Sequence, residues 1–580
     1  MNRHKILPLV LLIAALNPLI GATPSANHQQ SASLRDTETP EQHDARMSWW
    51  REAKFGLFIH WGLYAIPAEG EWYLRNHKMP LAEYKKYAAE FNPVKFDADE
   101  WASVAHDAGM KYMVVTAKHH DGFAMYPSKA SDYNITDATP FKRDPFKELS
   151  LACPKHDVKF GTYYSVISDW GHPGGGIGGD RWDETQKGDL DEYINKVSIP
   201  QVKELLTNYG PIAVMWFDSD GAKVPDPVEV GARYAPILKL QPNLIVRGGA
   251  GSYPGDFGGC ESHIPMKAPG GDWELCYTAN GSWGYTKAKA RPLEKLLPTL
   301  IEAWSKGGNV LLNVGPDREG LLPADSVAVL KQIGAWMQVN GEAVYGSTRG
   351  PFDYLPWGWA TRKGDMLYLF VLQWPKDGEL RIPMETPITK AWLLADATKA
   401  LESRKNNGVT ILKLSKDAPG PIASVIACKM DGNVPPSHSL PVEGPVTASD
   451  NARATQSVTN GRGGIWGIDK TNGWIELDLG KPKIFSTMRL TTPSYKAATK
   501  DALTCTKGSR IMLEAKVGDA WKTIFEEELP MNGKNREGQL VRTFEPITAQ
   551  YIRATFTAGK TENGETPKIR IGHFEFLPPL

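Results

Sequence analysis

Cysteine is scarce in this sequence, and the few cysteines are scattered. There are five in 580 residues, at Cys153, Cys260, Cys276, Cys428 and Cys505, and no two of them form a CxxC pair. This distribution excludes a disulfide framework and a structural zinc site built from paired cysteines. Cys260 and Cys276 are the pair close enough in sequence to favour a bridge, and the odd number leaves at least one thiol free.

An excess of charge and a metal-binding motif are also missing. Lysine plus arginine and aspartate plus glutamate both total 66, so the formal net charge is zero. This balance argues against nucleic acid or another polyanion as the partner. The sequence has no HExxH motif, and we expect neither a metal nor a cofactor.

Long hydrophobic runs are confined to the start of the chain. Three basic residues at 3–5 precede an apolar segment at 6–20, and small residues follow at 21–22. This pattern predicts an export signal over residues 1–22, followed by a flexible polar leader over 23–43. The apolar segment is interrupted by Asn17 and two prolines, which makes it too short and broken to span a membrane. Because no second such run follows, we expect no membrane insertion.

The best-defined strand of the chain ends on a carboxylate. Residues 211–218 (PIAVMWFD) form an apolar run that is bounded by turn residues and stops at Asp218. A run that is apolar on both faces predicts a buried parallel strand. Similar strands are predicted at 54–60, 112–118, 159–165, 243–247, 273–277 and 309–314, alternating with helices at 97–108, 145–156, 189–208, 228–240 and 293–304. This alternation predicts a TIM-type (β/α) barrel over residues 44–346, with one strand weak or lost.

The pattern changes after the predicted barrel. Short strands at close spacing predict an antiparallel β-sandwich over residues 347–430. Residues 431–446 are rich in proline, glycine and serine and predict a linker. Residues 447–580 predict a second all-β domain, so the fold class is α/β plus all-β.

Polar side chains gather at the ends of the predicted barrel strands. They are His60, His119, His120, Tyr163, Asp218 and Arg247, and Glu261 adds a second carboxylate just beyond the fifth strand. The carboxyl ends of barrel strands meet on one face, and two carboxylates without a metal motif favour glycoside hydrolysis. Zinc hydrolysis is the competing interpretation, because His119 and His120 are possible ligands. Adjacent residues on a strand point to opposite faces, however, which argues against one shared metal.

Several longer motifs surround these residues. They are Phe58-Ile-His-Trp-Gly62, Lys118-His-His-Asp-Gly-Phe123, Trp216-Phe-Asp218, Ser282-Trp-Gly-Tyr285, Ser305-Lys-Gly-Gly-Asn309 and Leu312-Asn-Val-Gly-Pro316. With them, the sequence from about Trp49 to Tyr345 resembles glycoside hydrolase family 29, the α-L-fucosidases.

The resemblance implies roles for individual residues. Asp218 would be the nucleophile of a retaining mechanism. Glu261 would be the general acid/base, favoured by its position relative to Arg247, with Glu274 on the next strand as the alternative. The residues expected to contact the sugar are His60, Glu71, Trp72, His119, His120, Tyr163, Trp216, Arg247 and Trp283.

The C-terminal segment carries a second resemblance. Thr447-Ala-Ser-Asp450, Gly473-Trp-Ile-Glu-Leu-Asp-Leu-Gly480 and Ile571-Gly-His-Phe-Glu-Phe576 are similar to a discoidin-type, carbohydrate-binding β-sandwich. Such a domain either makes a second contact with a glycan or supports the barrel structurally.

These expectations together describe an exported exo-α-L-fucosidase in the periplasm or outside the cell of a bacterium. Its substrate would be the terminal fucose of an oligosaccharide or glycoconjugate. Two alternatives stay open, a catalytically silent glycan-binding protein and a glycosidase for a related sugar such as a galactoside.

Overall fold

The computed structural model describes the chain from Glu38 onward with several gaps. The described residues are 38–176, 181–218, 224, 226–248, 255–406, 408–420, 422–433, 442–449, 459, 465–494, 505–531, 537–560 and 566–579. The predicted export signal and most of the predicted leader lie outside them. Helix α1 (Pro40–Ala53) begins inside the segment expected as leader, because Thr39 and Gln42 form a capping box and Pro40 opens the first turn.

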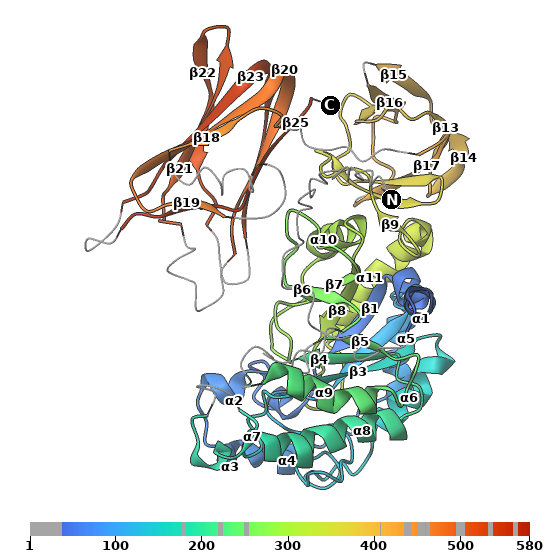
Figure 1. Ribbon diagram of the computed structural model, residues 1–580. Coiled ribbons are helices and arrows are strands. Elements are labelled where there is room, and N and C mark those ends of the chain that lie inside the picture. Colours follow the sequence, from blue (N-terminus) through green and yellow to red (C-terminus); the bar gives the residue numbers. More distant parts are fainter. Residues whose placement is uncertain are drawn as a thin grey trace, which may run out of the picture.

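The first domain is built on an eight-stranded parallel sheet (Figure 1). Its strands are β1 (Phe55–Ile59), β2 (Tyr112–Lys118), β3 (Lys159–Ser165), β4 (Val214–Asp218), β5 (Ile245–Arg247), β6 (Gly258–Glu261), β7 (Trp273–Thr278) and β8 (Asn309–Val314). The order in the sheet is β5-β4-β3-β2-β1-β8-β7-β6. Among the described residues, one isolated bridge joins Arg247 of β5 to Phe257, the residue before β6, so the sheet nearly closes into a barrel.

The seven predicted strands are all present, and the eighth is β6. Residues 258–261 (GGCE) have two glycines, and three of the four residues are exposed. They therefore lack the apolar run that marks a buried strand. The sheet adds this segment by parallel pairing to β7, with Glu261 opposite Cys276.

Helices cover the outside of the barrel. They are α2 (Tyr73–Asn76), α3 (Leu81–Lys85), α4 (Tyr87–Glu90), α5 (Ala98–Asp107), α6 (Pro145–Lys155), α7 (Leu190–Tyr193), α8 (Ile199–Asn208), α9 (Pro227–Leu238), α10 (Leu293–Ser305) and α11 (Ala324–Asn340). The helix expected over 189–208 is divided into α7 and α8 by a π-helical turn, Ile194–Ser198. None of the described helices is both long and apolar enough to cross a lipid bilayer.

The second domain is a β-sandwich, as the strand spacing predicts. One sheet has the order β14-β13-β17-β11-β10-β9 and the other β12-β16-β15. The strands are β9 (Thr348–Arg349), β10 (Gly358–Lys363), β11 (Met366–Val371), β12 (Glu379–Ile382), β13 (Ile388–Leu393), β14 (Asp396–Ala400), β15 (Ser403–Asn406), β16 (Val409–Lys413) and β17 (Ser424–Met430). The sandwich packs on α11, where the Trp336 indole N–H donates to the Ala423 carbonyl at 3.0 Å.

The third domain, here called the C-terminal domain, is also all-β. Its strands are β18 (Val446–Ala448), β19 (Trp466–Ile468), β20 (Asn472–Thr492), β21 (Arg510–Val517), β22 (Ala520–Glu528), β23 (Gly538–Thr557), β24 (Ile569–Ile571) and β25 (His573–Leu577). Inward residues alternate along β20, and Ile475, Leu477 and Leu479 enter a separate hydrophobic core. Part of the predicted linker, 434–441, lies outside the described residues.

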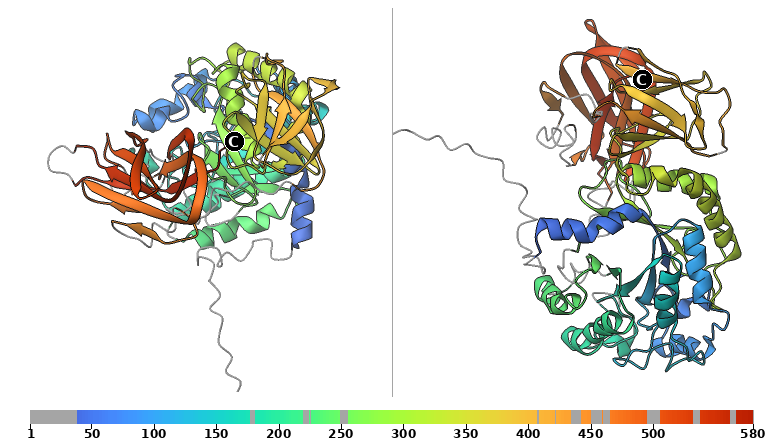
Figure 2. Two further views of the ribbon diagram at one scale, coloured as in Figure 1. Left: turned by 90° about the horizontal axis from the view of Figure 1, so that it is seen from above. Right: turned by 90° about the vertical axis from the view of Figure 1, so that its right-hand side faces the viewer.

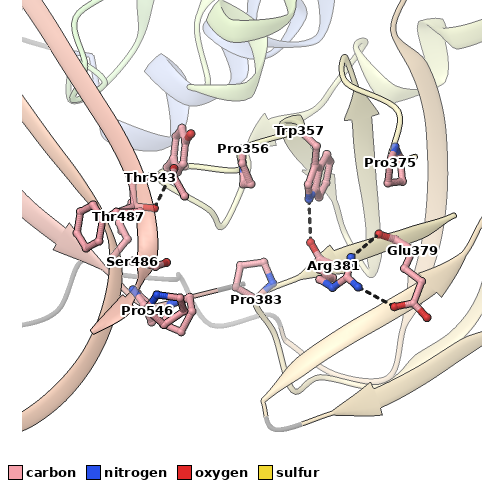
Figure 3. Close-up of a pocket in the computed structure, with 15 residues that line it drawn as sticks. Pro356, Trp357, Pro375, Glu379, Arg381, Pro383, Ser486, Thr487, Thr543 and Pro546 are labelled. Atoms are coloured by element: carbon pink, nitrogen blue, oxygen red, sulfur yellow. Dashed lines mark hydrogen bonds and ion pairs between the residues drawn. The ribbon is translucent and has the colours of Figure 1, made fainter. Parts of the chain in front are cut away.

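The two β domains lie side by side on the barrel (Figure 2). A pocket of about 350 Å³ lies where they meet. Figure 3 shows Trp357 and the Arg381–Glu379 ion pair of the sandwich facing Thr487 and Thr543 of the C-terminal domain. Because the C-terminal domain contacts both other domains, it is held in a defined position over the barrel.

Candidate active site

The sequence-predicted residues converge at the carboxyl ends of the barrel strands. His119 and Tyr163 stack with ring centroids 5.4 Å apart, and Tyr163 stacks on Trp216 at 5.5 Å. The ring of His60 lies 5.4 Å from each of His119 and Tyr163. Strands β1 to β4 therefore place one aromatic wall at the barrel mouth, as parallel topology requires.

Asp218 lies beside this wall as the last residue of β4. The Tyr163 hydroxyl donates to its Oδ2 at 2.7 Å, and His120 Nε2 is 3.6 Å from the same oxygen. The Asp218 side chain keeps 36% of its exposure. A carboxylate that is fixed by a hydroxyl yet open to the mouth is positioned to reach a ligand.

His60 and His120 are each held in place by a hydrogen bond from their Nδ1 atom. The Nδ1 atom of His60 bonds to the Asn313 amide oxygen at 2.7 Å, and the Nδ1 atom of His120 bonds to the Ser165 hydroxyl at 2.6 Å. Burial lowers the pKa of His60 to about 3 and that of His119 well below its usual range. Because burial disfavours the charged form, these two rings are neutral at pH 7.

His119 and His120 come closer together than strand alternation predicts. Their ring centroids lie 4.2 Å apart, because β2 ends at Lys118 and neither residue belongs to the strand. The prediction that the two side chains point to opposite faces of a strand is therefore wrong, because neither residue lies on the strand. No group of three or more metal-ligating side chains occurs among the residues that the structure describes.

A buried ion pair lies next to the backbone that carries His120. The Lys118 ammonium donates to Asp169 at 2.5 Å and to the Tyr193 hydroxyl at 2.6 Å, and Lys118 and Asp169 are both fully buried. Next to Asp169, the Trp170 backbone N–H donates to the His120 carbonyl at 2.6 Å. The backbone that carries His120 is thus fixed on the side away from the mouth.

Two loops meet at another side of the mouth. The Glu71 carboxylate accepts the Gly284 backbone N–H at 2.7 Å, and burial raises the pKa of Glu71. Trp283 lies 5.3 Å from His60 between ring centroids, and Trp72 lies 5.3 Å from His120. The structure therefore brings Glu71, Trp72 and Trp283 to the same mouth as the histidines.

Arg247 adds a cation to this assembly. Its guanidinium lies 4.2 Å from the centroid of the Trp216 ring, and Nη1 donates to the Phe217 carbonyl at 2.9 Å. The stacking fixes the cation one strand away from Asp218.

The two candidate acid/base residues have different surroundings. Glu274 is the second residue of β7 and is only 2% exposed. It accepts the Tyr112 hydroxyl at 2.5 Å and the Trp216 indole N–H at 3.1 Å, and burial raises its pKa to about 7. Glu261 is the last residue of β6, is exposed, and lies close enough to Glu71 for the two charges to repel.

The sequence interpretation assigned no role to several residues that build the site. Asn313 bonds to His60, Ser165 bonds to His120, and the Lys118–Asp169 pair lies next to the backbone that carries His120. Asn313 and Lys118 lie inside motifs that the resemblance used, so position in a motif was the available signal. Nothing local in the sequence marks Asp169, because its partner Lys118 is on another strand.

A parallel barrel whose aromatic mouth holds Asp218, with further carboxylates around it, defines a glycoside hydrolase. Comparison with protein families identifies which kind. The family described as Alpha-L-fucosidase matches residues 22–342, and the F5/8 type C domain matches residues 445–569. The chain belongs to the α-L-fucosidase family, glycoside hydrolase family 29, and carries a discoidin-like C-terminal domain.

Relatives of known name agree with this assignment. The plasma alpha-L-fucosidase of Homo sapiens is 33% identical over 390 residues, which cover 60% of this chain and 81% of the relative. The alpha-L-fucosidase structure from Vibrio sp. strain EJY3 is 28% identical with a TM-score of 0.69, covering 93% of this chain and 98% of that one. A family 29 enzyme from Bacteroides thetaiotaomicron, solved as a trapped covalent intermediate with 2-fluoro-fucosyl fluoride, is 29% identical with a TM-score of 0.60. It covers 67% of this chain and 97% of its own.

Proposed function

We propose that the protein is a retaining exo-α-L-fucosidase that releases terminal α-L-fucosyl residues from glycans. Asp218 attacks the anomeric carbon while Glu261 protonates the departing glycosidic oxygen. Glu261 then activates a water molecule, which releases fucose with the configuration retained. The proposal rests on one observation above the others, the fixed but accessible Asp218 at the centre of the barrel mouth.

The contacts of Asp218 suit a nucleophile. The Tyr163 hydroxyl and His120 both contact Oδ2. An ionised carboxylate whose one oxygen is held in this way keeps the other oxygen oriented for attack. The related Bacteroides thetaiotaomicron enzyme, trapped as a covalent intermediate, supports a double-displacement mechanism for this chain as well.

Position along the strands favours Glu261 over Glu274 as the acid/base. Both carboxylates are on neighbouring strands, but Glu261 ends β6 whereas Glu274 lies near the start of β7. Both Glu274 oxygens are already bonded, and the Trp216 ring that it contacts belongs to the mouth. Glu274 thus holds Trp216 from inside the barrel, and Glu261 faces the leaving group.

The remaining residues of the mouth bind the sugar. Neutral imidazoles donate to and accept from hydroxyl groups, and aromatic rings cover the apolar faces of a pyranose. The sugar-binding set is His60, Glu71, Trp72, His119, His120, Tyr163, Trp216, Arg247 and Trp283. Fucosylated oligosaccharides or glycoconjugates are therefore the proposed substrates.

Azide rescue tests the two carboxylate roles together. Asp218→Ala should abolish turnover of an aryl α-L-fucoside, and azide should restore it with an inverted fucosyl azide. Glu261→Ala should reduce turnover of natural fucosides by roughly 10²–10⁴-fold. On an aryl α-L-fucoside, whose leaving group needs little protonation, the first step should survive in that variant. Azide should then speed the second step and give a retained product, because azide attacks without a general base.

Glu274→Ala is the comparison variant. If it gives azide-rescued, retained product and Glu261→Ala does not, Glu274 is the acid/base. If the wild-type protein binds fucosides and releases no product, the hydrolase assignment for this chain is wrong.

A further inference from the structure

A polar cleft lies between the barrel and the C-terminal domain. Its volume is about 640 Å³, which is in the range of ligand sites. Ser262, His263 and Tyr277 line it from the barrel, and Glu537 and Gln539 line it from the C-terminal domain.

The cleft begins at the residues that follow the proposed acid/base. Glu261 ends β6, and Ser262 extends the parallel pairing by donating to the Cys276 carbonyl at 3.0 Å. The His263 ring then bonds back to the Glu261 carbonyl at 3.0 Å. Ser262 and His263 therefore lie at the barrel rim next to Glu261, and the rest of the lining, Tyr277 and α10, extends from the rim along the outside of the barrel. Since a general acid lies beside the leaving oxygen, this end of the cleft adjoins the leaving group.

The C-terminal domain is bonded directly to this segment. Glu537 accepts the Met266 backbone N–H at 2.5 Å, and the Gln539 side-chain amide donates to the Ile264 carbonyl at 3.2 Å. The same amide also donates to Glu537 at 2.9 Å. From the barrel, the Lys306 ammonium donates to the Pro265 carbonyl at 2.7 Å. Both walls of the cleft are therefore fixed relative to Glu261.

The lining has the chemistry of a saccharide site. Carboxylate, amide, imidazole and hydroxyl groups bond to sugar hydroxyls, and a Tyr ring covers an apolar sugar face. Glu302 and Thr299 of α10 add two more polar groups to the lining.

We propose that this cleft binds the saccharide to which the fucose is attached. The barrel supplies the fucose site, and the C-terminal domain supplies the outer wall of the leaving-group site through Glu537 and Gln539. The inference rests on the proposed function, because it uses Glu261 to define the leaving-group side. The C-terminal domain thereby contributes to the choice of substrate.

Filling the cleft without touching its anchoring bonds tests this directly. Thr299→Trp places a large ring in the cleft from α10, where the Thr299 hydroxyl bonds only within its own helix, to the Lys295 carbonyl. Thr207→Trp is the matched control, because Thr207 lies on α8 with the same bond to the carbonyl four residues earlier. Gln539→Ala is a second variant, which removes part of the outer wall together with the bond from the Gln539 amide to the Ile264 carbonyl.

Three substrate types separate the possible causes. They are nitrophenyl α-L-fucoside, methyl α-L-fucoside and a panel of fucosylated lactoses and N-acetyllactosamines. Thr299→Trp should lower kcat/KM at least about 10-fold for the oligosaccharides that the wild type prefers, and leave methyl fucoside within twofold. Gln539→Ala should act in the same direction, and Thr207→Trp should change nothing.

Methyl fucoside is the decisive substrate, because methanol is a poor leaving group that is too small to reach the cleft. A parallel loss on methyl fucoside would mean that the variants displace Glu261, and would overturn the proposal. Unchanged oligosaccharide kinetics in Thr299→Trp would overturn it as well.

A binding measurement covers the case in which oligosaccharides turn over slowly. In Asp218→Ala, calorimetry should show that a preferred oligosaccharide binds more tightly than methyl fucoside, and Thr299→Trp should remove this gain. If no member of the panel binds better than methyl fucoside, the cleft is not a saccharide site. Failure of the wild type on both simple fucosides would instead refute the proposed function.

Discussion

At the scale of single residues, the site combines buried, neutral histidines with the accessible carboxylate of Asp218. His60 and His119 are neutral because they are buried, while Asp218 is partly exposed. Tyr163 connects these groups, because it stacks on His119 and donates to Asp218.

Tyr163→Phe should show how much the hydrogen bond from the Tyr163 hydroxyl to Asp218 contributes to the rate. The ring stacking stays, and a bond to a charged group worth roughly 1.5–3 kcal/mol is lost, so kcat on an aryl fucoside should fall about 10- to 100-fold. Tyr164→Phe is the matched control, because the Tyr164 hydroxyl bonds to Gln201 outside the site. Equal effects of the two substitutions would contradict the assigned role of Tyr163.

Glu274 should make stability depend on pH. Burial raises its pKa from 4.5 to about 7, so between these values the folded protein holds a proton that the unfolded chain releases. Its contribution to stability is therefore complete below pH 4.5 and is lost as the pH rises through 7. Relative to Glu274→Gln, the wild type should lose roughly 3 kcal/mol of unfolding free energy between pH 4.5 and 8. Urea unfolding at several pH values measures this, and parallel curves for the two proteins would refute it.

At the scale of elements, the shape of the barrel mouth depends on the close approach of two loops, one that carries Gly70 and Glu71 and one that carries Gly284 and Tyr285. Gly70 donates its N–H to the Tyr285 carbonyl at 3.2 Å, and Gly284 donates to Glu71. A Cβ atom at Gly284 would lie 2.7 Å from the Glu71 backbone nitrogen, so glycine is required for this approach.

Gly284→Ala should displace Glu71 and weaken the site. We expect kcat/KM to fall about 10-fold or more for every fucoside, since small displacements of positioning groups have large effects on rate. Gly270→Ala is the control, because a Cβ atom there meets nothing within 4 Å. Full activity of Gly284→Ala would show that the loop adapts.

Seven barrel strands and most strands of the sandwich could be predicted from sequence because their apolar runs are local signals. The short strands β9, β14 and β15 could not, because they are largely exposed and carry no such run. Strand β6 could not, since GGCE gains its strand conformation only by pairing with β7. Helix α11 also escaped notice, because apolar residues do not follow one stripe along it. Within the site, Asp218 and the histidines were found from strand ends, whereas the pairing of Lys118 with Asp169 depends on the tertiary fold.

At the scale of the whole molecule, no disulfide joins the three domains of the chain. All five cysteines are free. Cys260 and Cys276, the pair that the sequence favours for a bridge, lie on opposite faces of the barrel sheet. Cys260 packs against the outer core, whereas Cys276 lies among the inner residues of the barrel. Apart from the polypeptide itself, hydrogen bonds and packing hold the domains together.

Reducing agents should therefore leave the protein unchanged. The melting temperature in dithiothreitol should equal that without it, because no bridge exists to be cut. Ellman's reagent should detect five thiols in the unfolded chain and react slowly with the folded one, since four thiols are buried. A count of three in the oxidised, unfolded protein would reveal a disulfide.

In the described part of the chain, no continuous strand ladder joins β5 to β6, and this gap in the barrel sheet has a mechanical consequence. Asp218 and Glu261 are on opposite sides of the gap between β5 and β6, so the continuous ladder that connects them runs the long way round the sheet. Across this gap Asp256 bonds to both the N–H and the carbonyl of Val246 and to the buried Arg46. The spacing of the two carboxylates therefore depends on these few bonds and not on a ladder. Amides of β5 and β6 should exchange with deuterium faster than those of β1, which is paired on both sides. A fucose-shaped inhibitor that contacts both carboxylates should slow this exchange, and amides of β5 and β6 protected as long as those of β1 would show a rigid ring. A sugar that contacts both carboxylates would join the two edges of the sheet across this gap.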